Sequence, residues 1–377
     1  MGVGREMAPR TPDPRVRPTL PETSGVFRYL PGVSVSSPEH RDPVDPSNSE
    51  PQARASSGQK VLQDDEKPCR REIRAISAMF DRRPFTEGWL EIEDLRLSYE
   101  VHGTGPRVLV FLHGLLLDAQ MNRRLADDLA ERGHRVILLD MPGHGHSDKP
   151  RLAWAHRIDS YAHHVVALLD ELGLDEAVVG GVSLGANVSL QVAVQAPGRV
   201  RGLLVEMPVL EWAVPATAVI FVPLLLGLHC AAPLARLLGK VARRIPRTRI
   251  GTIDSFVSAA TSEPEEAVAV LHGMLVGPIA PTYDERRAIE VPTLVIGHRV
   301  DVVHPFTDAN HLARQLPHAR LLEARSVLEL RMNPQRLTGH IADFLDEVWS
   351  PPPLSQDPSP LSQDPSTEAA GAQAHGA

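Results

Sequence analysis

Short runs of nearly continuous apolar residues recur through the middle of the chain. Each run is followed by a stretch with helical periodicity, as in parallel strands that crossover helices bury on both faces. One such helix is predicted over residues 158–174, because its amphipathic pattern ends in Gly173 just before the next run. The predicted buried strands are 108–112 (VLVFL), 136–140 (VILLD), 177–182 (AVVGGV), 203–207 (LLVEM) and 293–297 (TLVIG).

The pattern differs at both ends of this region. Residues 89–103 (WLEIEDLRLSYEVHG) alternate apolar and polar side chains on either side of Glu93 and Asp94, which predicts an antiparallel hairpin. A last strand is expected at 320–323, and a final helix at 334–348 carries an apolar stripe on one face. The expected fold class is therefore α/β, with a mostly parallel sheet that is flanked by helices and begins in an antiparallel hairpin.

The alternation of strand and helix stops between residues 208 and 290. Only helices are predicted there, so this segment is expected to form a helical cap over the strand ends, and the α/β core is assigned to 87–207 and 291–349. The cap begins with an apolar run, 212–238, that is long enough for a membrane span. Prolines at 215, 223 and 233 interrupt this run, which favours a buried or interfacial helical cap over a span.

The two ends of the chain, 1–86 and 350–377, differ in composition from the rest. Proline, serine and arginine are frequent in the first, and the second contains a tandem repeat of PLSQDPS at 353–359 and 360–366. Such segments bury too little apolar surface to offset the entropy of ordering them, so both are expected to be disordered, apart from a short helix near residues 71–80. The first residues lack the apolar core of a secretory signal, and Met79 is an alternative start of translation.

Composition narrows the classes of function. The chain has 377 residues, of which 42% are apolar and 23% charged, and this is enough for a sizeable core. The net charge of −8 is spread along the chain, so no nucleic-acid partner is expected. Cys69 and Cys230 form neither a disulfide framework nor the paired spacing of a zinc site. We expect a reducing, cytoplasmic location and no cofactor or metal, and the oligomeric state stays open.

The strongest chemical signal is GVSLG, residues 181–185, between a predicted strand and a predicted helix. A serine at such a sharp turn is held in a strained backbone conformation, and Gly181 and Gly185 let strand and helix approach each other. The turn presents the Ser183 hydroxyl at the carboxyl edge of the sheet. We therefore predict that Ser183 is a nucleophile rather than part of an ordinary packing turn.

A second signal lies at the end of the first buried strand, where His113 and Gly114 follow. This turn is predicted to point the amide of Leu115 toward Ser183. Together with the amide of Leu184 at the helix N-terminus, it would form a two-donor oxyanion hole. His113 is expected to have a structural role and to bond to the backbone.

The loop DMPGHGHSD, residues 140–148, follows the next strand. Asp140 and Ser147 are expected to hold the loop by hydrogen bonds. His144 and His146 have a spacing seen in metal ligands, but no carboxylate or cysteine follows at ligand spacing. We interpret these two residues as solvated loop histidines.

Taken together, these motifs resemble the α/β-hydrolase superfamily. HG follows the third strand, DxxGxGxS the fourth and GxSxG the fifth, and a late GxxxDxxHP completes the set. The resemblance covers residues 89–348 and is loose across the helical cap. It implies that Asp301 is the acid of a catalytic triad, with Glu206 at the end of the sixth strand as an alternative acid position.

The position at which this family usually has its catalytic histidine is occupied by Val327, just after the last strand. His340 follows a glycine but falls within the final helix, where packing is its expected role. His304, in the same loop as the implied acid, is the favoured base. His229 and His272 in the helical cap are further candidates.

The predicted reaction is hydrolysis of an ester or related acyl substrate through an acyl-enzyme on Ser183. Apolar cap residues, including Val219, Phe221 and Leu224, favour a small hydrophobic substrate, although cap-to-core packing explains them equally well. A serine without its base loses about 10⁴–10⁶ in kcat, so a non-catalytic ligand-binding protein on the same scaffold stays open. A membrane-associated lipase or acyltransferase is a third alternative, and membrane contact is the less favoured expectation.

Overall fold

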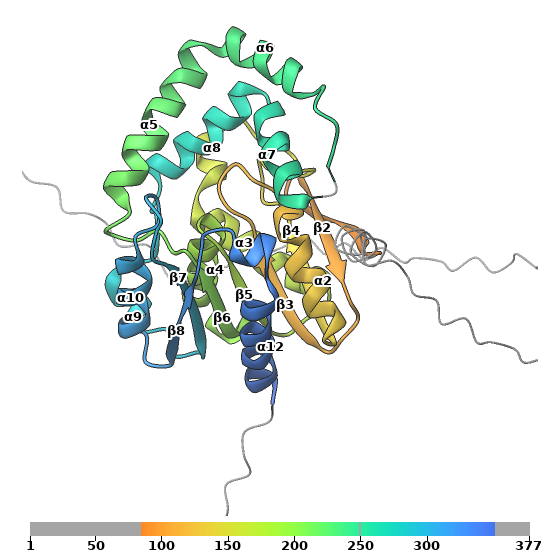
Figure 1. Cartoon of the computed structure of the whole chain (residues 1–377), viewed down its shortest axis with the longest axis vertical. Coiled ribbons are helices and arrows are strands. Elements are labelled where there is room, and N and C mark those ends of the chain that lie inside the picture. Colours follow the sequence, from red (N-terminus) through yellow and green to blue (C-terminus); the bar gives the residue numbers. More distant parts are fainter. Residues whose placement is uncertain (1–83, 249, 351–377) are drawn as a thin grey trace, which may run out of the picture. The chain divides into compact units, whose positions relative to one another are not determined.

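A computed structural model describes residues 84–248 and 250–350 (Figure 1). Within these residues, eight strands form one sheet in the order β1-β2-β4-β3-β5-β6-β7-β8. The strands are β1 (Thr86–Ile92), β2 (Leu95–His102), β3 (Arg107–Leu112), β4 (His134–Leu139), β5 (Ala177–Val182), β6 (Val200–Glu206), β7 (Thr293–His298) and β8 (Ala319–Ala324). β1 pairs antiparallel with β2, and β2 with β4, whereas the remaining pairs are parallel.

Helices cover both faces of the sheet and fill the segment between β6 and β7. The α-helices are α2 (Arg123–Glu131), α3 (Ile158–Glu171), α4 (Leu184–Gln195), α5 (Val214–Cys230), α6 (Ala232–Ala242), α7 (Gly251–Thr261), α8 (Pro264–Val276), α9 (Tyr283–Arg287), α10 (Phe306–Gln315), α11 (Glu329–Met332) and α12 (Gln335–Trp349). Short 3₁₀ helices are η1 (Ala119–Asn122), η2 (Ala153–His156) and η3 (Pro197–Arg199).

Side chains of the central strands alternate between two hydrophobic layers. In β3, Val108, Val110 and Leu112 pack into the layer formed with α3, α4 and α10. Leu109 and Phe111 pack into the opposite layer, which includes residues of α2 and α12. Because the strand is covered on both faces, its sequence shows no polar alternation.

The predicted fold class is confirmed, and each predicted strand is present. β4 and β6 begin earlier than predicted, because His134 and Val200 still pair with the neighbouring strands β3 and β5. β1 begins at Thr86, one residue before the predicted start of the core. Residues 1–83, with the helix expected near 71–80, and residues 351–377 lie outside the described part of the chain.

The insertion between β6 and β7 consists of α5 to α9, and α5 to α8 extend over the carboxyl ends of the strands (Figure 1). Two buried core side chains hold it in place. Asn187 on α4 donates to the carbonyl oxygens of Val209 and Ile279, both at 2.7 Å, and accepts from the Val209 amide at 3.1 Å. Asp308 on α10 accepts from three backbone amides just ahead of α5. Both ends of the insertion are thus fixed to helices that flank the sheet.

The packing of α5 differs from that of a core helix. None of its 17 residues is buried, although its sequence, VPATAVIFVPLLLGLHC, has no Asp, Glu, Lys or Arg. In the described residues, no single helix is long and apolar enough to cross a membrane, and α5 and α6 meet that criterion only as a pair bent by 97°. The sequence analysis expected this apolar run to be either a buried or an interfacial helix, and the expectation of a buried helix is wrong for α5.

Candidate active site

Ser183 lies in the tight turn between β5 and α4. Its backbone has φ 55° and ψ −113°, a conformation that costs a non-glycine residue about 1–3 kcal/mol. A Cβ at Gly181 would lie 2.5 Å from the Gly185 carbonyl carbon, and one at Gly185 would lie 2.5 Å from the Leu112 carbonyl oxygen. Only glycine fits at these two positions, which explains the GxSxG spacing.

His304 and Asp301 lie in the loop after β7 and reach the serine turn from there. The Nε2 atom of His304 is 2.8 Å from the Oγ atom of Ser183, and its Nδ1 atom is 2.9 Å from Oδ2 of Asp301. When Nδ1 donates its proton to the carboxylate, Nε2 is free to accept the serine proton. The structure thus brings together the predicted nucleophile, the favoured base and the implied acid of the sequence analysis.

The Asp301 carboxylate is held as an anion. Its Oδ1 atom accepts from the amides of Val303 at 2.8 Å and His304 at 3.0 Å. Burial opposes ionisation, but the hydrogen bonds from the His304 side chain and from these amides lower the pKa of Asp301 to about 2. A carboxylate that is ionised and anchored in this way orients the imidazole and selects its tautomer.

The loop after β3 approaches the serine turn from the neighbouring strand. Gly114 lies against Ser183, since a Cβ on this glycine would be 3.9 Å from the serine Cβ. Leu115 and Leu184, whose amides are the predicted oxyanion donors, line the same cavity as Ser183. Leu184 is the first residue of α4, so its amide has no carbonyl acceptor within the helix.

His113 is fully buried behind this loop. Its Nε2 atom accepts from the Met141 amide at 3.0 Å, and its Nδ1 atom donates to the Gly114 carbonyl oxygen at 2.9 Å. Burial lowers the pKa of this imidazole, which fits a neutral ring bonded to the backbone at both nitrogens, as predicted. The following loop is held by the Ser147 hydroxyl, which donates to the Asp140 carbonyl oxygen at 2.5 Å.

His144 is buried, so its predicted role as a solvated loop residue is wrong. Its Nε2 atom accepts from the Leu116 amide at 3.1 Å, and its Nδ1 atom donates to the Pro142 carbonyl oxygen at 3.0 Å. Leu116 has φ 62°, so this bond supports a left-handed residue directly after Leu115. His146 is exposed. No group of three or more His, Cys, Asp or Glu residues that could hold a metal ion occurs in the described residues.

Glu206, the alternative acid, is buried and has other partners. Arg331 donates to both of its carboxylate oxygens at 2.7 Å, and His298 Nε2 lies 3.6 Å from Oε1. Burial opposes the charge, but Arg331 and His298 lower the pKa of Glu206. The structure places Asp301, and not Glu206, beside the imidazole of His304.

The other histidines that were considered as bases are all exposed. His340 lies on α12 with its side chain in solvent, so the expectation that it packs in the core is wrong. His229 on α5 and His272 on α8 do not line the cavity at Ser183. Val327 does line it, so the family's usual histidine position is close to the site but holds an apolar side chain.

A cavity of about 450 Å³ lies beside Ser183, between the core and the helical insertion. Most of its lining is apolar, and the insertion contributes Phe221 from α5 and Phe256 from α7. Of the apolar cap residues highlighted in the sequence, Phe221 therefore faces the site. Val219 and Leu224 do not line the cavity and are 73% and 38% exposed.

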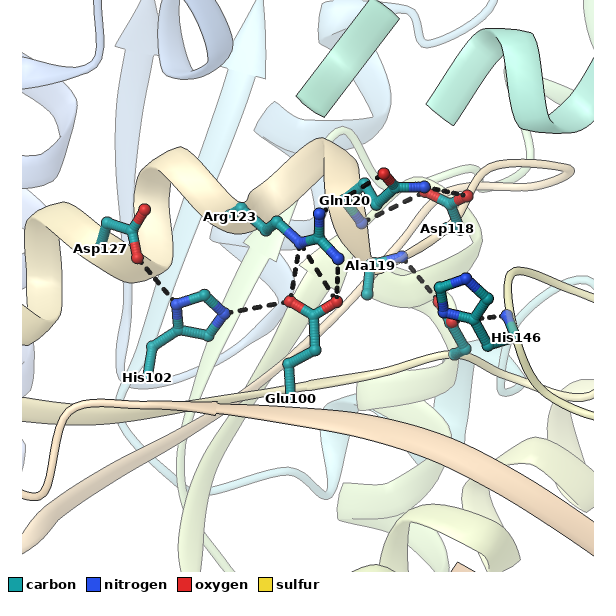
Figure 2. Close-up of polar contacts among 9 residues, drawn as sticks. Glu100, His102, Asp118, Ala119, Gln120, Arg123, Asp127 and His146 are labelled. Atoms are coloured by element: carbon teal, nitrogen blue, oxygen red, sulfur yellow. Dashed lines mark hydrogen bonds and ion pairs between the residues drawn. The ribbon is translucent and has the colours of Figure 1, made fainter. Parts of the chain in front are cut away.

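A buried polar cluster next to η1 was not found from the sequence (Figure 2). His102 on β2 bonds to Asp127 at 2.8 Å and to Glu100 at 3.1 Å, and the Arg123 Nε atom lies 3.1 and 2.9 Å from the two Glu100 oxygens. Burial disfavours charge on His102, but the two carboxylates raise its pKa above the ordinary value. Polar alternation in β2 and the charged face of α2 were the available signals, but neither indicates that the two elements meet.

Comparisons with known proteins support the same fold family. Residues 107–226 match the family described as the alpha/beta hydrolase fold. The chain is 36% identical over 119 residues to the dihydrolipoyllysine-residue acetyltransferase component of the acetoin cleaving system of Cupriavidus necator, a match that covers 32% of this chain and 31% of that protein. It is 25% identical over 302 residues to an uncharacterized protein of Mycobacterium tuberculosis, covering 72% of this chain and 85% of that protein.

The first curated relatives are matched over about a third of their own length. Among solved structures, the enol-lactonase from Burkholderia xenovorans LB400 superposes with a TM-score of 0.55 and 21% identity, over 68% of this chain and 99% of that one. The mixed sheet and the strained serine turn are those of the α/β-hydrolase fold. Residues 107–226 are thus similar in sequence to α/β hydrolases, as the motifs indicated, and the described residues share the fold of the enol-lactonase structure.

Proposed function

We propose that this protein is a serine hydrolase that cleaves an ester or related acyl bond through an acyl-enzyme on Ser183. The observation that carries the proposal is the hydrogen-bonded series from Asp301 through His304 to Ser183, with distances of 2.9 and 2.8 Å. A base within hydrogen-bond reach of a serine, itself oriented by a carboxylate, is the arrangement that activates a hydroxyl nucleophile. The arrangement exists although Val327 replaces the histidine usual in the family.

The proposed reaction has two halves. The Ser183 oxygen attacks the acyl carbon while His304 Nε2 takes the hydroxyl proton, and the carbonyl oxygen becomes an oxyanion that the amides of Leu115 and Leu184 stabilise. His304 returns the proton to the leaving alkoxide as the acyl–oxygen bond breaks, which yields an alcohol and an acyl-enzyme. Water then attacks the acyl carbon with His304 again as base, and the bond from the acyl carbon to the Ser183 oxygen breaks as His304 returns the proton to that oxygen and the carboxylic acid is released. Asp301 stays ionised and stabilises the imidazolium in both halves.

The cavity supports a small hydrophobic substrate. Its volume of about 450 Å³ is in the range of small-molecule sites. Apart from Asp301 and His304, the ionisable side chain in its lining is Arg331, whose guanidinium already pairs with Glu206. A neutral acyl group therefore fits this cavity better than a charged one, because no unpaired charge in the lining would compensate its desolvation.

Hydrolysis of p-nitrophenyl esters of increasing acyl length tests the proposal. Wild type is expected to turn over, with kcat/KM rising with acyl length until the cavity is filled. Ser183→Ala should abolish turnover, and His304→Ala should lower kcat by about 10⁴–10⁶-fold. His340→Ala is a matched control, because it removes an exposed imidazole on α12 and is expected to leave kcat unchanged. Wild-type turnover in His304→Ala would contradict this mechanism.

A non-catalytic ligand-binding protein is the second candidate, and Val327 is the observation that favours it. This function predicts that carboxylic acids and esters bind in the cavity without turnover. Calorimetric binding of an acyl compound to a folded wild-type protein that hydrolyses none of the esters would favour this alternative over the hydrolase.

A further inference from the structure

The outer surface of α5 and α6 exposes many large apolar side chains. We call residues 212–245 the α5–α6 face. Its members include Trp212 (60% exposed), Val219 (73%), Leu226 (55%), Leu234 (55%), Leu238 (60%) and Val241 (51%). Monomeric soluble proteins rarely leave a large contiguous apolar patch in water, so an exposed surface of this kind indicates a contact with another phase or molecule.

The helix α6 turns its apolar side away from the protein. Leu234, Leu238 and Val241 recur at helical spacing and are all exposed, with Leu237 between them. The side that faces the protein carries the buried Gly239, where an added Cβ would lie 3.4 Å from the Ala260 carbonyl oxygen of α7. This orientation is the reverse of that of a helix packing on a soluble core.

Cationic residues border the same face. From residue 212 to residue 253 the sequence has five arginines and one lysine and no aspartate or glutamate, in a chain of net charge −8. Arg236 and Arg243 pair with Glu265 and Glu263 near the start of α8. Lys240 and Arg244 are exposed, and no carboxylate of the described residues lies within ion-pair distance of either. These two cations are thus available to an anionic partner beside the apolar side chains.

The geometry favours a position on a bilayer rather than across it. The axes of α5 and α6 differ by 97°, so the two helices do not form one straight span. Helices that combine an exposed apolar face with cationic residues lie in the plane of the headgroup–acyl boundary. Their binding grows with buried apolar area and with attraction to anionic lipids.

We infer that the α5–α6 face docks on the surface of a lipid bilayer that contains anionic headgroups. The apolar side chains enter the headgroup–acyl boundary, and Lys240 and Arg244 contact lipid phosphates and carboxylates. Lys240 and Arg244 are attracted to an anionic bilayer surface. A second copy of this chain is a poorer partner for the face, because it would place the same cations against each other. The inner side of α5 presents Thr217 and Phe221 to the Ser183 cavity, so one helix separates the proposed membrane contact from the site.

This surface goes beyond the proposed hydrolysis and does not depend on it. The full chain carrying Ser183→Ala, which removes any lipid turnover, is sedimented with vesicles of phosphatidylcholine alone and with added phosphatidylserine. Binding is expected for both, with higher affinity for the vesicles that contain phosphatidylserine and a decrease as salt is added. Replacing Lys240 and Arg244 by glutamine should lower the affinity for the anionic vesicles by roughly 20–30-fold and remove most of their advantage.

The apolar contact is tested by Leu226→Glu with Leu238→Glu, which should weaken binding to both kinds of vesicle. Leu321→Glu is the matched control, because Leu321 is an exposed leucine (37%) on β8, outside the α5–α6 face. Retained far-ultraviolet circular dichroism shows that each variant is folded.

Three results would overturn the inference. The first is a folded chain that binds neither kind of vesicle, and the second is binding that the paired glutamate variant leaves unchanged. The third is a concentration-dependent dimer that this variant abolishes, because the face would then join two copies of the chain. A wild-type chain that hydrolyses no ester but binds vesicles would contradict the proposed function and still support this inference.

Discussion

At the scale of single residues, the base and the acid of the proposed triad come from one turn of the loop after β7. Asp301 accepts from the backbone amide of His304 and from its Nδ1 atom, so the two residues orient each other. The imidazole then reaches Ser183 without any contribution from the segment after β8. The hydrogen bonds from Asp301 through His304 to Ser183 are therefore complete, although Val327 occupies the position of the family's usual histidine.

The role of the Asp301 carboxylate can be tested with a substitution that keeps the size and shape of the side chain. Asp301→Asn is expected to lower kcat by about 10²–10⁴-fold with little change in KM, because a neutral amide no longer stabilises the imidazolium and favours the wrong tautomer. Steady-state hydrolysis of a p-nitrophenyl ester measures both constants. Glu206→Gln is the comparison for the alternative acid, and a larger loss of kcat in that variant than in Asp301→Asn would contradict the assignment.

The strained backbone of Ser183 gives a prediction for stability. Ser183→Gly should unfold at a higher temperature than Ser183→Ala, because glycine adopts φ 55° and ψ −113° without a cost of about 1–3 kcal/mol. The larger conformational entropy of glycine in the unfolded chain reduces this gain by about 0.5–1 kcal/mol. Scanning calorimetry compares the two variants. Equal or reversed unfolding temperatures would mean that the turn carries no such strain in solution.

At the scale of helices and strands, the parts of the fold that a local pattern encodes were predictable. A strand covered on both faces must be apolar at successive positions, and the serine turn needs glycine where a Cβ would meet backbone, as at Gly185. The orientation of α5 was not predictable, because a helix that is apolar all round has no stripe to indicate which side faces the core. Sequence spacing placed His304 beside Asp301 and at the same sheet edge as Ser183, but it did not show that the imidazole bonds to both residues.

The cluster that ties β2 to α2 predicts a pH-dependent contribution to stability. The folded pKa of His102 lies above its ordinary value of 6.5, so the stabilisation from Asp127 and Glu100 is fully present below pH 6.5 and is lost as pH rises through the folded pKa. The unfolding temperature of wild type relative to His102→Gln should therefore fall as the pH is raised above 6.5. A difference between the two proteins that is independent of pH would contradict a charged imidazole held by Glu100 and Asp127.

Asn187 joins the helix that follows Ser183 to both ends of the helical insertion. Asn187→Ala leaves the Val209 amide and two carbonyl groups without this partner and should destabilise the fold by roughly 2–4 kcal/mol. Urea unfolding measures the loss, and faster proteolysis within residues 208–290 would locate it in the insertion. Gln195→Ala, at an exposed position of the same helix, is expected to change neither the free energy of unfolding nor the rate of proteolysis. Unchanged proteolysis in Asn187→Ala would argue against this anchoring role.

At the scale of the whole described core, the site forms where separate stretches of the chain meet. The turn after β5 supplies Ser183, the loop after β3 supplies Leu115, and the loop after β7 supplies His304. The helical insertion then closes the apolar cavity over them through residues such as Phe221. The insertion whose outer face we propose to contact lipid therefore also lines the cavity beside the serine.

We propose that His304 activates Ser183, and labelling with a fluorophosphonate probe measures that activation directly. Wild type is predicted to react at Ser183, as located by peptide mapping, and Ser183→Ala should not react. His304→Ala should react about 10²–10³-fold more slowly or not at all, whereas the exposed control His340→Ala should match wild type. A folded wild type that does not react, or a His304→Ala variant that reacts at the wild-type rate, would contradict activation of Ser183 by His304.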